Sequence, residues 1–204
     1  MAINTFSTLK SAVADWLDRD DIGNAIDNMI GLMESRLYSQ LRVRNMESAL
    51  SETIASGTIT LPSDWIEAKS IYINSSPIRV LEFKSLDWLQ KQYPTRSSSG
   101  KPIYAALSTT TMVFGPYPDS TYEVAGTYYA RPSALSTSNE SNWLTTNWPD
   151  LLLYGTLVHS ALYLGQDARL PLWEAAYQDC FNRIMGNERG EAYPKGVALK
   201  AVAG

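Results

Sequence analysis

Residues Pro149 to Leu164 read PDLLLYGTLVHSALYL and contain the most apolar run of the chain. The preceding Asn147-Trp148 pair resembles a helix cap, and Pro149 suits the first turn of a helix, where its missing N–H costs nothing. The apolar side chains that follow fall on more than one face of this helix. A helix that is apolar on several faces has to be covered by neighbours, so we expect this segment to be buried among other elements.

Two helices are predicted before it, at the start of the chain. Apolar residues recur at spacings of three and four in the first segment, at Phe6, Leu9, Val13, Trp16 and Leu17. The same spacing continues over a second segment, Asp21 to Arg44, for more than five turns. Between the two segments lies Asp18 to Asp21, whose acidic side chains we expect to cap the second helix.

A last helix is predicted to open at Pro171. Its stripe of apolar side chains consists of Leu172, Trp173, Ala176, Tyr177, Cys180, Phe181 and Ile184. Gly186 is a suitable stop. The remaining segment, residues 187–204, has no usable period, and we expect it to be an extended or loosely held arm.

The middle of the chain has the pattern of short strands, with β-branched and aromatic residues between Gly, Pro, Ser and Asn. The strands are expected at Thr58 to Leu61, Ala68 to Ile73, Ile78 to Phe83, Ile103 to Leu107, Thr111 to Phe114 and Tyr122 to Tyr129. Asn74 to Pro77 is typical of a hairpin loop and therefore indicates antiparallel pairing. Lys84 to Gln92 is expected to be a short helix, and Pro94 to Gly100 an exposed loop.

These segments together predict an α+β fold. The helical bundle is built from residues 1–45 and 133–186, because each end of the chain has an apolar stripe that needs cover. Residues 46–132 form an inserted antiparallel β subdomain, and residues 187–204 form the C-terminal arm.

Composition narrows the classes of function. With 204 residues and 45% hydrophobic side chains, the chain can form one core with an insert. Its net charge of −4 argues against a non-specific nucleic-acid binder. One Cys and one His exclude a disulfide framework and a zinc finger, so we expect no metal and no cofactor.

No membrane partner is expected either. Residues 1–17 lack the features of a secretory signal. The apolar run Leu151 to Gly165 is shorter than the roughly 20 residues that a membrane-spanning helix needs. We therefore expect a protein made in the cytoplasm.

Candidates for catalysis are few. We expect His159 to be a core histidine satisfied by a hydrogen bond, and Cys180 to be a packed, inert thiol. The aspartates at positions 15, 18, 20 and 21 suit a capping turn better than a cation site. Nucleotide-binding, nucleophile-elbow and metalloprotease motifs are missing from the sequence. A cell-wall hydrolase that uses an Asp/Glu pair stays as an alternative.

Aromatic residues are the more informative feature, with 6 Trp and 12 Tyr. Those in the middle segment or at its borders exceed what a small β subdomain needs for its own core. Some are therefore expected to face partners, since Trp and Tyr dominate interface anchors. A β-sheet module that binds sugars or peptides is a further alternative.

Several turn motifs occur in a fixed order along the chain. They are Leu61-Pro62-Ser63-Asp64-Trp65, Gly100-Lys101-Pro102-Ile103-Tyr104, Gly115-Pro116-Tyr117-Pro118-Asp119, Tyr128-Tyr129-Ala130-Arg131-Pro132, Asn142-Trp143-Leu144 and Pro149-Asp150-Leu151-Leu152-Leu153-Tyr154. Because these motifs occur in this order, with predicted helices before and after them, the sequence resembles the head-to-tail adaptor (connector or tail-completion) proteins of tailed bacteriophages, especially those with short tails. The resemblance runs from about Thr5 to Ile184.

The resemblance implies a non-enzymatic protein of the virion at the head-tail junction, present in the host cytoplasm before assembly. Such adaptors form a homo-oligomeric ring, typically a dodecamer, under the portal protein, and tail nozzle or tail fibre proteins dock beneath. DNA is only passing cargo. Helices from both chain ends surround the channel, and the C-terminal extension reaches the portal.

Three groups of site residues follow from this hypothesis. The arm is expected to bind the portal through Tyr193, Pro194, Val197, Leu199 and Val202. Contacts between subunits are expected at charged residues of the second helix, namely Glu34, Arg36, Arg42 and Arg44. Tail proteins are expected to dock on the β subdomain at Arg96, Lys101 and Tyr117.

Overall fold

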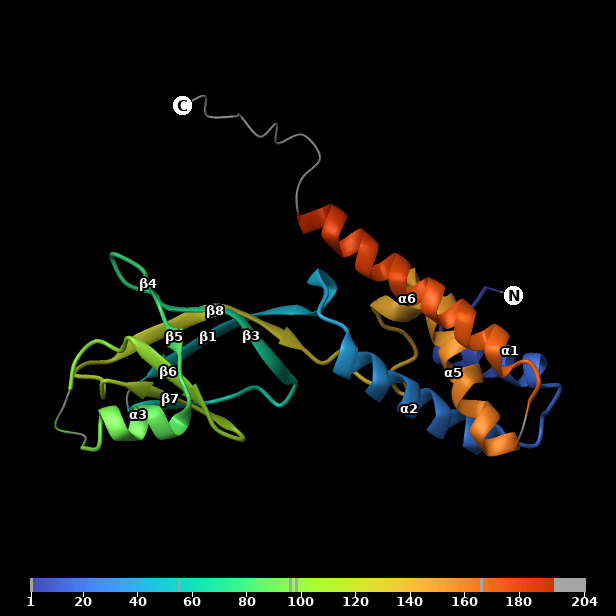
Figure 1. Cartoon of the computed structure of the whole chain (residues 1–204), viewed down its shortest axis with the longest axis horizontal. Helices are drawn as coiled ribbons and strands as arrows, with labels where there is room; N and C mark the ends of the chain where they lie inside the picture. Colours follow the sequence, from blue (N-terminus) through green and yellow to red (C-terminus); the bar gives the residue numbers. More distant parts are fainter. Residues whose placement is uncertain (1, 55, 96, 98, 166, 193–204) are drawn as a thin grey trace, which may run out of the picture. The chain divides into compact units, whose positions relative to one another are not determined.

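The computed structural model describes residues 2–54, 56–95, 97, 99–165 and 167–192. The chain forms two compact units (Figure 1). Met1–Asn45 and Pro132–Gly204 make up the helical unit, and Met46–Arg131 make up the β unit. The architecture is therefore α+β, with the strands inserted between the two halves of a helical bundle, as predicted from the sequence.

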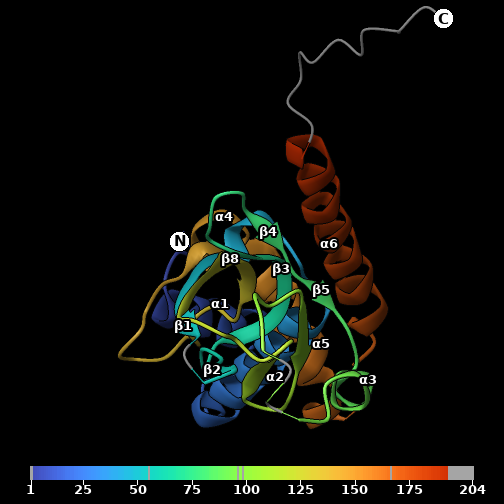
Figure 2. The ribbon, with the colours of Figure 1, turned by 90° about the vertical axis from the view of Figure 1, so that its left-hand side faces the viewer.

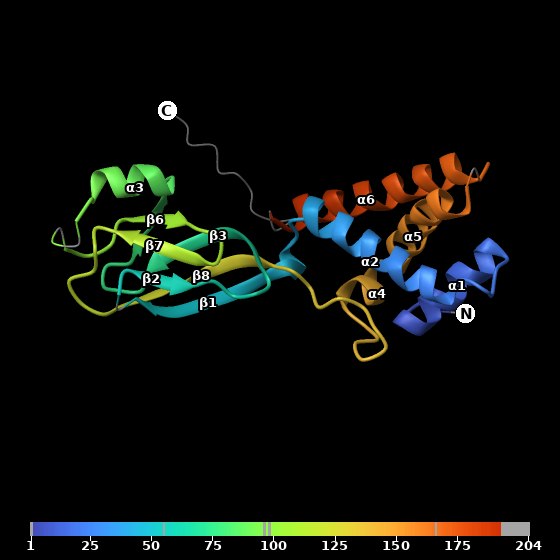
Figure 3. The same cartoon turned by 90° about the horizontal axis from the view of Figure 1, so that it is seen from below.

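The helical unit is organised around α5 (Pro149–Leu164), which contacts α1 (Phe6–Leu17), α2 (Gly23–Gln40), α4 (Trp143–Asn147) and α6 (Leu170–Ala192) (Figure 3). Leu151, Leu152, Leu153 and Leu157 are buried, which confirms the predicted burial among neighbours. Two hydroxyls in this apolar setting are satisfied within the helix. Thr156 Oγ1 donates to the Leu152 carbonyl at 2.7 Å, and Ser160 Oγ donates to the Leu157 carbonyl at 2.7 Å.

The first two helices are confirmed, but the turn between them differs from the prediction. Asp18 follows α1 in the left-handed conformation, with φ of 53°. Ile22 precedes α2, and within the described residues no side chain caps that helix. The acidic turn therefore does not cap α2. The N-terminus of α1, in contrast, has a capping box between Thr5 and Thr8.

Two helix ends were also predicted wrongly. Helix α2 ends at Gln40, so Arg42 lies beyond it and Arg44 begins a short 3-10 turn, η1 (Arg44–Met46). Helix α6 continues to Ala192 instead of stopping at Gly186. A Cβ on Gly186 would meet nothing within 4 Å; this glycine lowers helix stability by about 1 kcal/mol relative to Ala without ending the helix. Residues 187–192 therefore belong to the helix and not to the arm.

The β unit consists of two four-stranded sheets whose apolar faces share one core. The first sheet has the order β1-β8-β3-β4, and the second β2-β7-β6-β5. Their strands are β1 (Glu47–Ile54), β2 (Thr58–Thr60), β3 (Trp65–Ile73), β4 (Arg79–Val80), β5 (Glu82–Phe83), β6 (Tyr104–Leu107), β7 (Thr111–Gly115) and β8 (Tyr122–Ala130). Ile54 and Ile71 from the first sheet and Met112 and Phe114 from the second belong to the same buried cluster.

Three details of the β unit differ from the sequence prediction. Strand β1 was not predicted. The single strand expected over Ile78 to Phe83 is divided into β4 and β5, which lie in different sheets, with buried Leu81 between them. The pair β5–β6 is parallel, so the second sheet is mixed. The antiparallel β3–β4 hairpin and the short helix α3 (Leu86–Gln92; Figure 2) are confirmed, and α3 contacts β6 and β7.

Gly126 sits where β8 and β3 approach too closely for a side chain. A Cβ there would overlap the Ser70 carbonyl oxygen and would lie 2.9 Å from Ile71 Cα. Backbone atoms in the middle of a sheet have little room to move, so we expect Gly126→Ala to destabilise the protein by about 1–3 kcal/mol.

The matched control is Gly31→Ala on α2, where a Cβ would meet nothing within 4 Å. This variant should gain about 0.5–1 kcal/mol from helix propensity. Thermal unfolding followed by circular dichroism measures both changes. Equal melting temperatures for the two variants would contradict the packing described at Gly126.

Candidate interaction surfaces

Glu34 was expected on the surface of α2, and this prediction is wrong. Its side chain is only 3% exposed. The carboxylate accepts the Leu135 N–H at 3.1 and 3.3 Å through its two oxygens, and Oε1 also accepts the Tyr38 hydroxyl at 2.9 Å. Glu34 therefore holds the segment that follows β8 against α2 and is not available for a contact between subunits.

Burial raises the pKa of Glu34, and the hydrogen bonds from Leu135 and Tyr38 oppose this rise. The folded protein therefore binds a proton at Glu34 more tightly than the unfolded chain. It follows that stability falls as pH rises from the unfolded pKa through the folded pKa. The ionised carboxylate is tolerated because its oxygens are hydrogen-bonded.

A second carboxylate, that of Glu140, fixes the other end of the segment that follows β8. Glu140 accepts the Ser7 N–H at 3.0 Å and the Ser7 hydroxyl at 2.7 Å, and its carbonyl accepts the Phe6 N–H at 2.6 Å. The backbone and hydroxyl hydrogen bonds from Ser7 lower the pKa of Glu140. Residues 132–142 are therefore tied to both α2 and α1, which orders the return of the chain into the helical unit.

The three arginines predicted with Glu34 lie in different surroundings. The Arg36 guanidinium lies 4.5 Å from the centre of the Tyr177 ring and is half-buried. Arg42 Nη1 donates to the Tyr38 and Leu41 carbonyls at 3.0 and 2.7 Å, so it satisfies the carboxyl end of α2. Arg44 is exposed, and its backbone N–H donates to the Glu188 carboxylate at 3.0 Å. Of the four predicted charges, Arg44 is the one with an exposed side chain.

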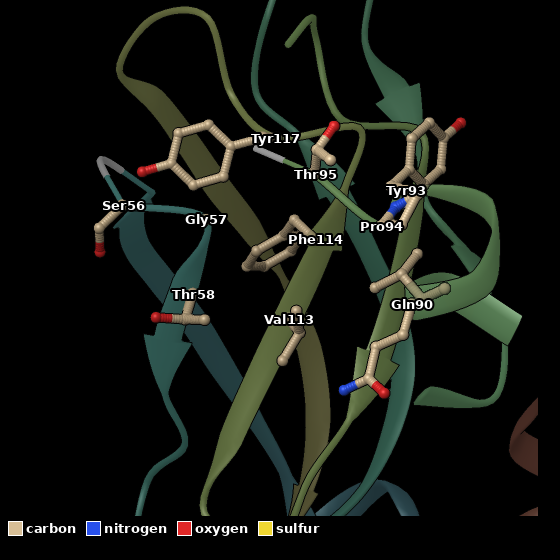
Figure 4. Close-up of a pocket in the computed structure, with 11 residues that line it drawn as sticks. Ser56, Gly57, Thr58, Gln90, Tyr93, Pro94, Thr95, Val113, Phe114 and Tyr117 are labelled. Atoms are coloured by element: carbon tan, nitrogen blue, oxygen red, sulfur yellow. The ribbon is translucent and has the colours of Figure 1, made fainter. Parts of the chain in front are cut away.

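The residues predicted to dock tail proteins also lie in different surroundings. Lys101 Nζ donates to Ser75 Oγ and to the Pro77 carbonyl at 3.5 Å, so it braces the β3–β4 hairpin. Tyr117 lines a groove next to β7 (Figure 4). Arg96 lies outside the described residues.

The Tyr117 groove has a volume of about 300 Å³ and is hollowed between the Gly57 turn and the end of α3. Phe114 and Val113 form its floor, and the rings of Tyr117 and Tyr93 lie on opposite sides (Figure 4). A Cβ on Gly57 would lie 2.8 Å from the Tyr117 ring, so only glycine allows this close approach. None of the residues that line the groove is charged. The groove therefore suits a neutral segment with apolar and hydrogen-bonding groups.

A polar hollow of about 590 Å³ lies beside the last turns of α6. It is lined by Val43, Asn45, Trp143, Thr146, Asn147, Trp148, Ile184, Asn187 and Glu188. Trp143 Nε1 is buried, and within the described residues it has no hydrogen-bond acceptor. The arm residues Tyr193, Pro194, Val197, Leu199 and Val202 follow this hollow in sequence and lie outside the described residues.

The candidate catalytic residues are not grouped. Cys180 is buried, and burial, followed by the contact with Asp150, raises the pKa of its thiol, as expected for an inert cysteine. Burial, and then Arg36, lowers the pKa of His159. Its Nε2 is buried and lacks a hydrogen-bond partner within the described part of the chain, so the predicted hydrogen bond is wrong for this atom.

The described residues hold neither a candidate metal site nor a candidate membrane-spanning helix. Among residues 2–192, apart from the gaps named above, His, Cys, Asp and Glu side chains do not gather in threes that could hold a metal ion. Within the same part of the chain, none of the helices combines the length and the hydropathy required to cross a bilayer.

The chain is similar to a known protein family. The family model described as SU10 adaptor protein matches residues 4–199, which include both units. No curated protein matches the chain.

The role of Glu34 can be tested with two substitutions. Glu34→Ala leaves the buried Leu135 N–H without its acceptor, and we expect a loss of about 1–3 kcal/mol of stability. Glu34→Gln keeps an acceptor oxygen and removes the buried charge. Its melting temperature relative to the natural protein should therefore rise as pH increases from the ordinary glutamate pKa through the raised pKa of the folded protein, because only the natural protein then buries an ionised group. A difference that stays constant over this range would contradict the assignment.

Proposed function

The chain belongs to the SU10 adaptor protein family, and we propose that it forms a ring that joins the portal of a phage capsid to the tail and continues the DNA channel. Members of this family are structural phage proteins. The observation that carries the proposal is the family match, because it extends over residues 4–199 and so includes the bundle, the β insert and much of the arm.

Portal binding is proposed for the C-terminal arm, with Tyr193, Pro194, Val197, Leu199 and Val202 as the anchors. Helix α6 is 23 residues long, and the arm follows directly from its end. At about 1.5 Å per residue the helix is roughly 34 Å long. The arm therefore begins at the far end of α6 from its first turn. The polar hollow beside its last turns is a second place where a partner chain can enter.

Contacts between neighbouring subunits are proposed to include Arg44, because its side chain is exposed, and the exposed edge of Arg36. Glu34 is excluded because it is buried. Arg42 is assigned to helix capping rather than to the ring. A ring needs two different complementary faces on each subunit, so these arginines can supply only one of them.

Docking of a tail nozzle or fibre protein is proposed for the β unit at the Tyr117 groove. Tyr93 and Tyr117, the two tyrosines of this groove, offer large rigid surfaces to a partner at low cost in conformational entropy. An extended segment with proline or small apolar residues suits such an aromatic-lined groove.

The arm proposal is tested by removing residues 193–204. The truncated chain ends with α6, so we expect its thermal unfolding to match that of the full chain, because the described helices and sheets do not include these residues. Co-sedimentation with purified portal rings should fall at least about tenfold. Undiminished co-sedimentation would show that another part of the chain binds the portal.

The groove proposal is tested with Tyr117→Ala. We expect assembled particles to keep the adaptor on the portal but to lose the tail proteins, since only the groove is altered. The control is Leu172→Ala, which removes an exposed apolar side chain of the helical unit. Electron microscopy of the particles measures tail occupancy. Full occupancy with Tyr117→Ala would place tail docking elsewhere.

A further inference from the structure

One end of the helical unit carries an excess of negative charge. The turn from α1 to α2 and the turn from α5 to α6 meet at this end (Figure 1, Figure 3). We call residues 15–21, 163–165 and 167–169 the acidic tip. These segments contain five aspartates, at positions 15, 18, 20, 21 and 167, against the two arginines Arg19 and Arg169.

Contacts between the two turns make the acidic tip a single surface. Arg169 Nη1 donates to the Trp16 carbonyl at 2.9 Å, which links α6 to the end of α1. Both arginines are already paired with aspartates of the tip: Arg19 with Asp21 at 2.6 Å and Arg169 with Asp167 at 2.9 Å. In the described part of the chain, the carboxylates of Asp15 and Asp20 have neither an ion pair nor a side-chain hydrogen bond. Their charge is therefore open to a cationic partner.

The acidic tip also exposes two aromatic side chains. Trp16 is 44% exposed, and Tyr163 is 62% exposed. The Trp16 ring is held edge-on against Tyr154, with 5.7 Å between ring centres, so its position is fixed before any partner arrives. Exposed aromatic rings rimmed by one sign of charge are typical of a protein-binding surface.

A surface of the opposite kind lies on the β unit. The hairpin between β3 and β4, residues 74–80, projects from the edge of the first sheet (Figure 1). On its return strand Ile78 and Val80 are 61% and 66% exposed, and Arg79 between them is exposed as well and points to the opposite face of the strand. Within the described residues the Arg79 guanidinium has no ion pair or hydrogen bond. We call residues 78–80 the cationic finger.

The cationic finger is held in place by polar contacts around its turn. Lys101 Nζ donates to Ser75 Oγ, and the Asn74 side-chain amide donates to Glu123 at 2.8 Å. Ser75 Oγ in turn donates to the Pro77 carbonyl at 2.8 Å. A hairpin braced in this way loses little conformational freedom when it binds.

We propose that the cationic finger of one copy docks on the acidic tip of a neighbouring copy, with Arg79 between Asp15 and Asp20 and beside the exposed rings of Trp16 and Tyr163. This inference rests on the proposed ring and adds the two unlike faces that a closed head-to-tail ring requires.

The charge of the surfaces favours a second copy over other occupants. An acidic surface repels nucleic acid and anionic lipid, whereas an exposed arginine complements the charge of the tip and can lie over its exposed aromatic rings. Because both faces belong to the same chain, every copy carries one of each, and association can continue from copy to copy.

A charge exchange tests the pairing. Arg79→Glu, or Asp15→Arg together with Asp20→Arg, should each weaken self-association of the full chain at least about tenfold at low ionic strength. All three substitutions together should restore it. Lys91→Glu, and Glu52→Arg together with Glu174→Arg, are the controls, since they make the same changes of charge at exposed positions elsewhere. Sedimentation equilibrium measures association. A triple variant as weak as the single-face variants would overturn the proposal.

Disulfide trapping locates the contact without the portal. Arg79→Cys and Asp20→Cys are purified separately, with tags of different size, then mixed and oxidised. We expect the mixed dimer to exceed both homodimers, and the control mixture of Lys91→Cys with Asp20→Cys to give no such excess. The native Cys180 is buried and does not compete. Equal amounts of mixed dimer in the two mixtures would refute the docking.

The two measurements separate this inference from the proposed function. If the mixed dimer forms but the natural chain does not bind portal rings, the copy–copy contact stands and the portal assignment fails. If the chain decorates the portal but neither trapping nor charge exchange gives the expected result, the ring is held by other surfaces. A disulfide that forms only within one chain carrying both Arg79→Cys and Asp20→Cys would also overturn the inference, because the finger would then dock on its own tip.

Discussion

The fold of the helical unit depends on the burial of α5. Leucines on several of its faces are buried, and even its hydroxyls are satisfied inside the helix, by the Leu152 and Leu157 carbonyls. A helix of this kind is stable only when other helices cover it on all sides. Because α1 and α2 come from the start of the chain and α6 comes from the end, the two ends must meet around α5, and everything between them has to form a separate unit.

Elements with a strong apolar period could be predicted from the sequence, and elements fixed by polar contacts could not. Helices α1 and α2 show their stripes directly. Strand β1 was missed because most of its positions face solvent, and only Leu50 and Ile54 point into the core. The end of α6 was missed because Gly186 was taken for a stop signal, whereas a glycine on an open helix face weakens a helix without breaking it.

The candidate site shows the same limit at the level of single residues. Arg44 has the exposure that its position predicts, but Glu34 does not, because the loop that buries it is 101 residues away in sequence. Lys101 was expected to face a partner and instead braces a hairpin 26 residues away. A charged residue in a helix or loop is normally exposed, and only a long-range contact of this kind overrules that expectation. One sequence signal could have revealed the burial of Glu34. It follows Met33, which belongs to the apolar stripe of α2, so Glu34 lies beside that stripe.

Polar contacts also decide how strongly the subunit can associate. The apolar stripes of α1, α2, α5 and α6 are used inside the helical unit, so the surfaces left for partners combine single aromatic or aliphatic side chains with charges. Exposed ion pairs contribute about 0–1 kcal/mol each, which is too little to hold two copies together at low concentration. Several such contacts on one preformed partner act together, because each bound copy raises the effective concentration of the next. We therefore propose that this adaptor associates weakly in solution and firmly only on a preformed partner. This is the behaviour that ordered assembly at a single junction requires.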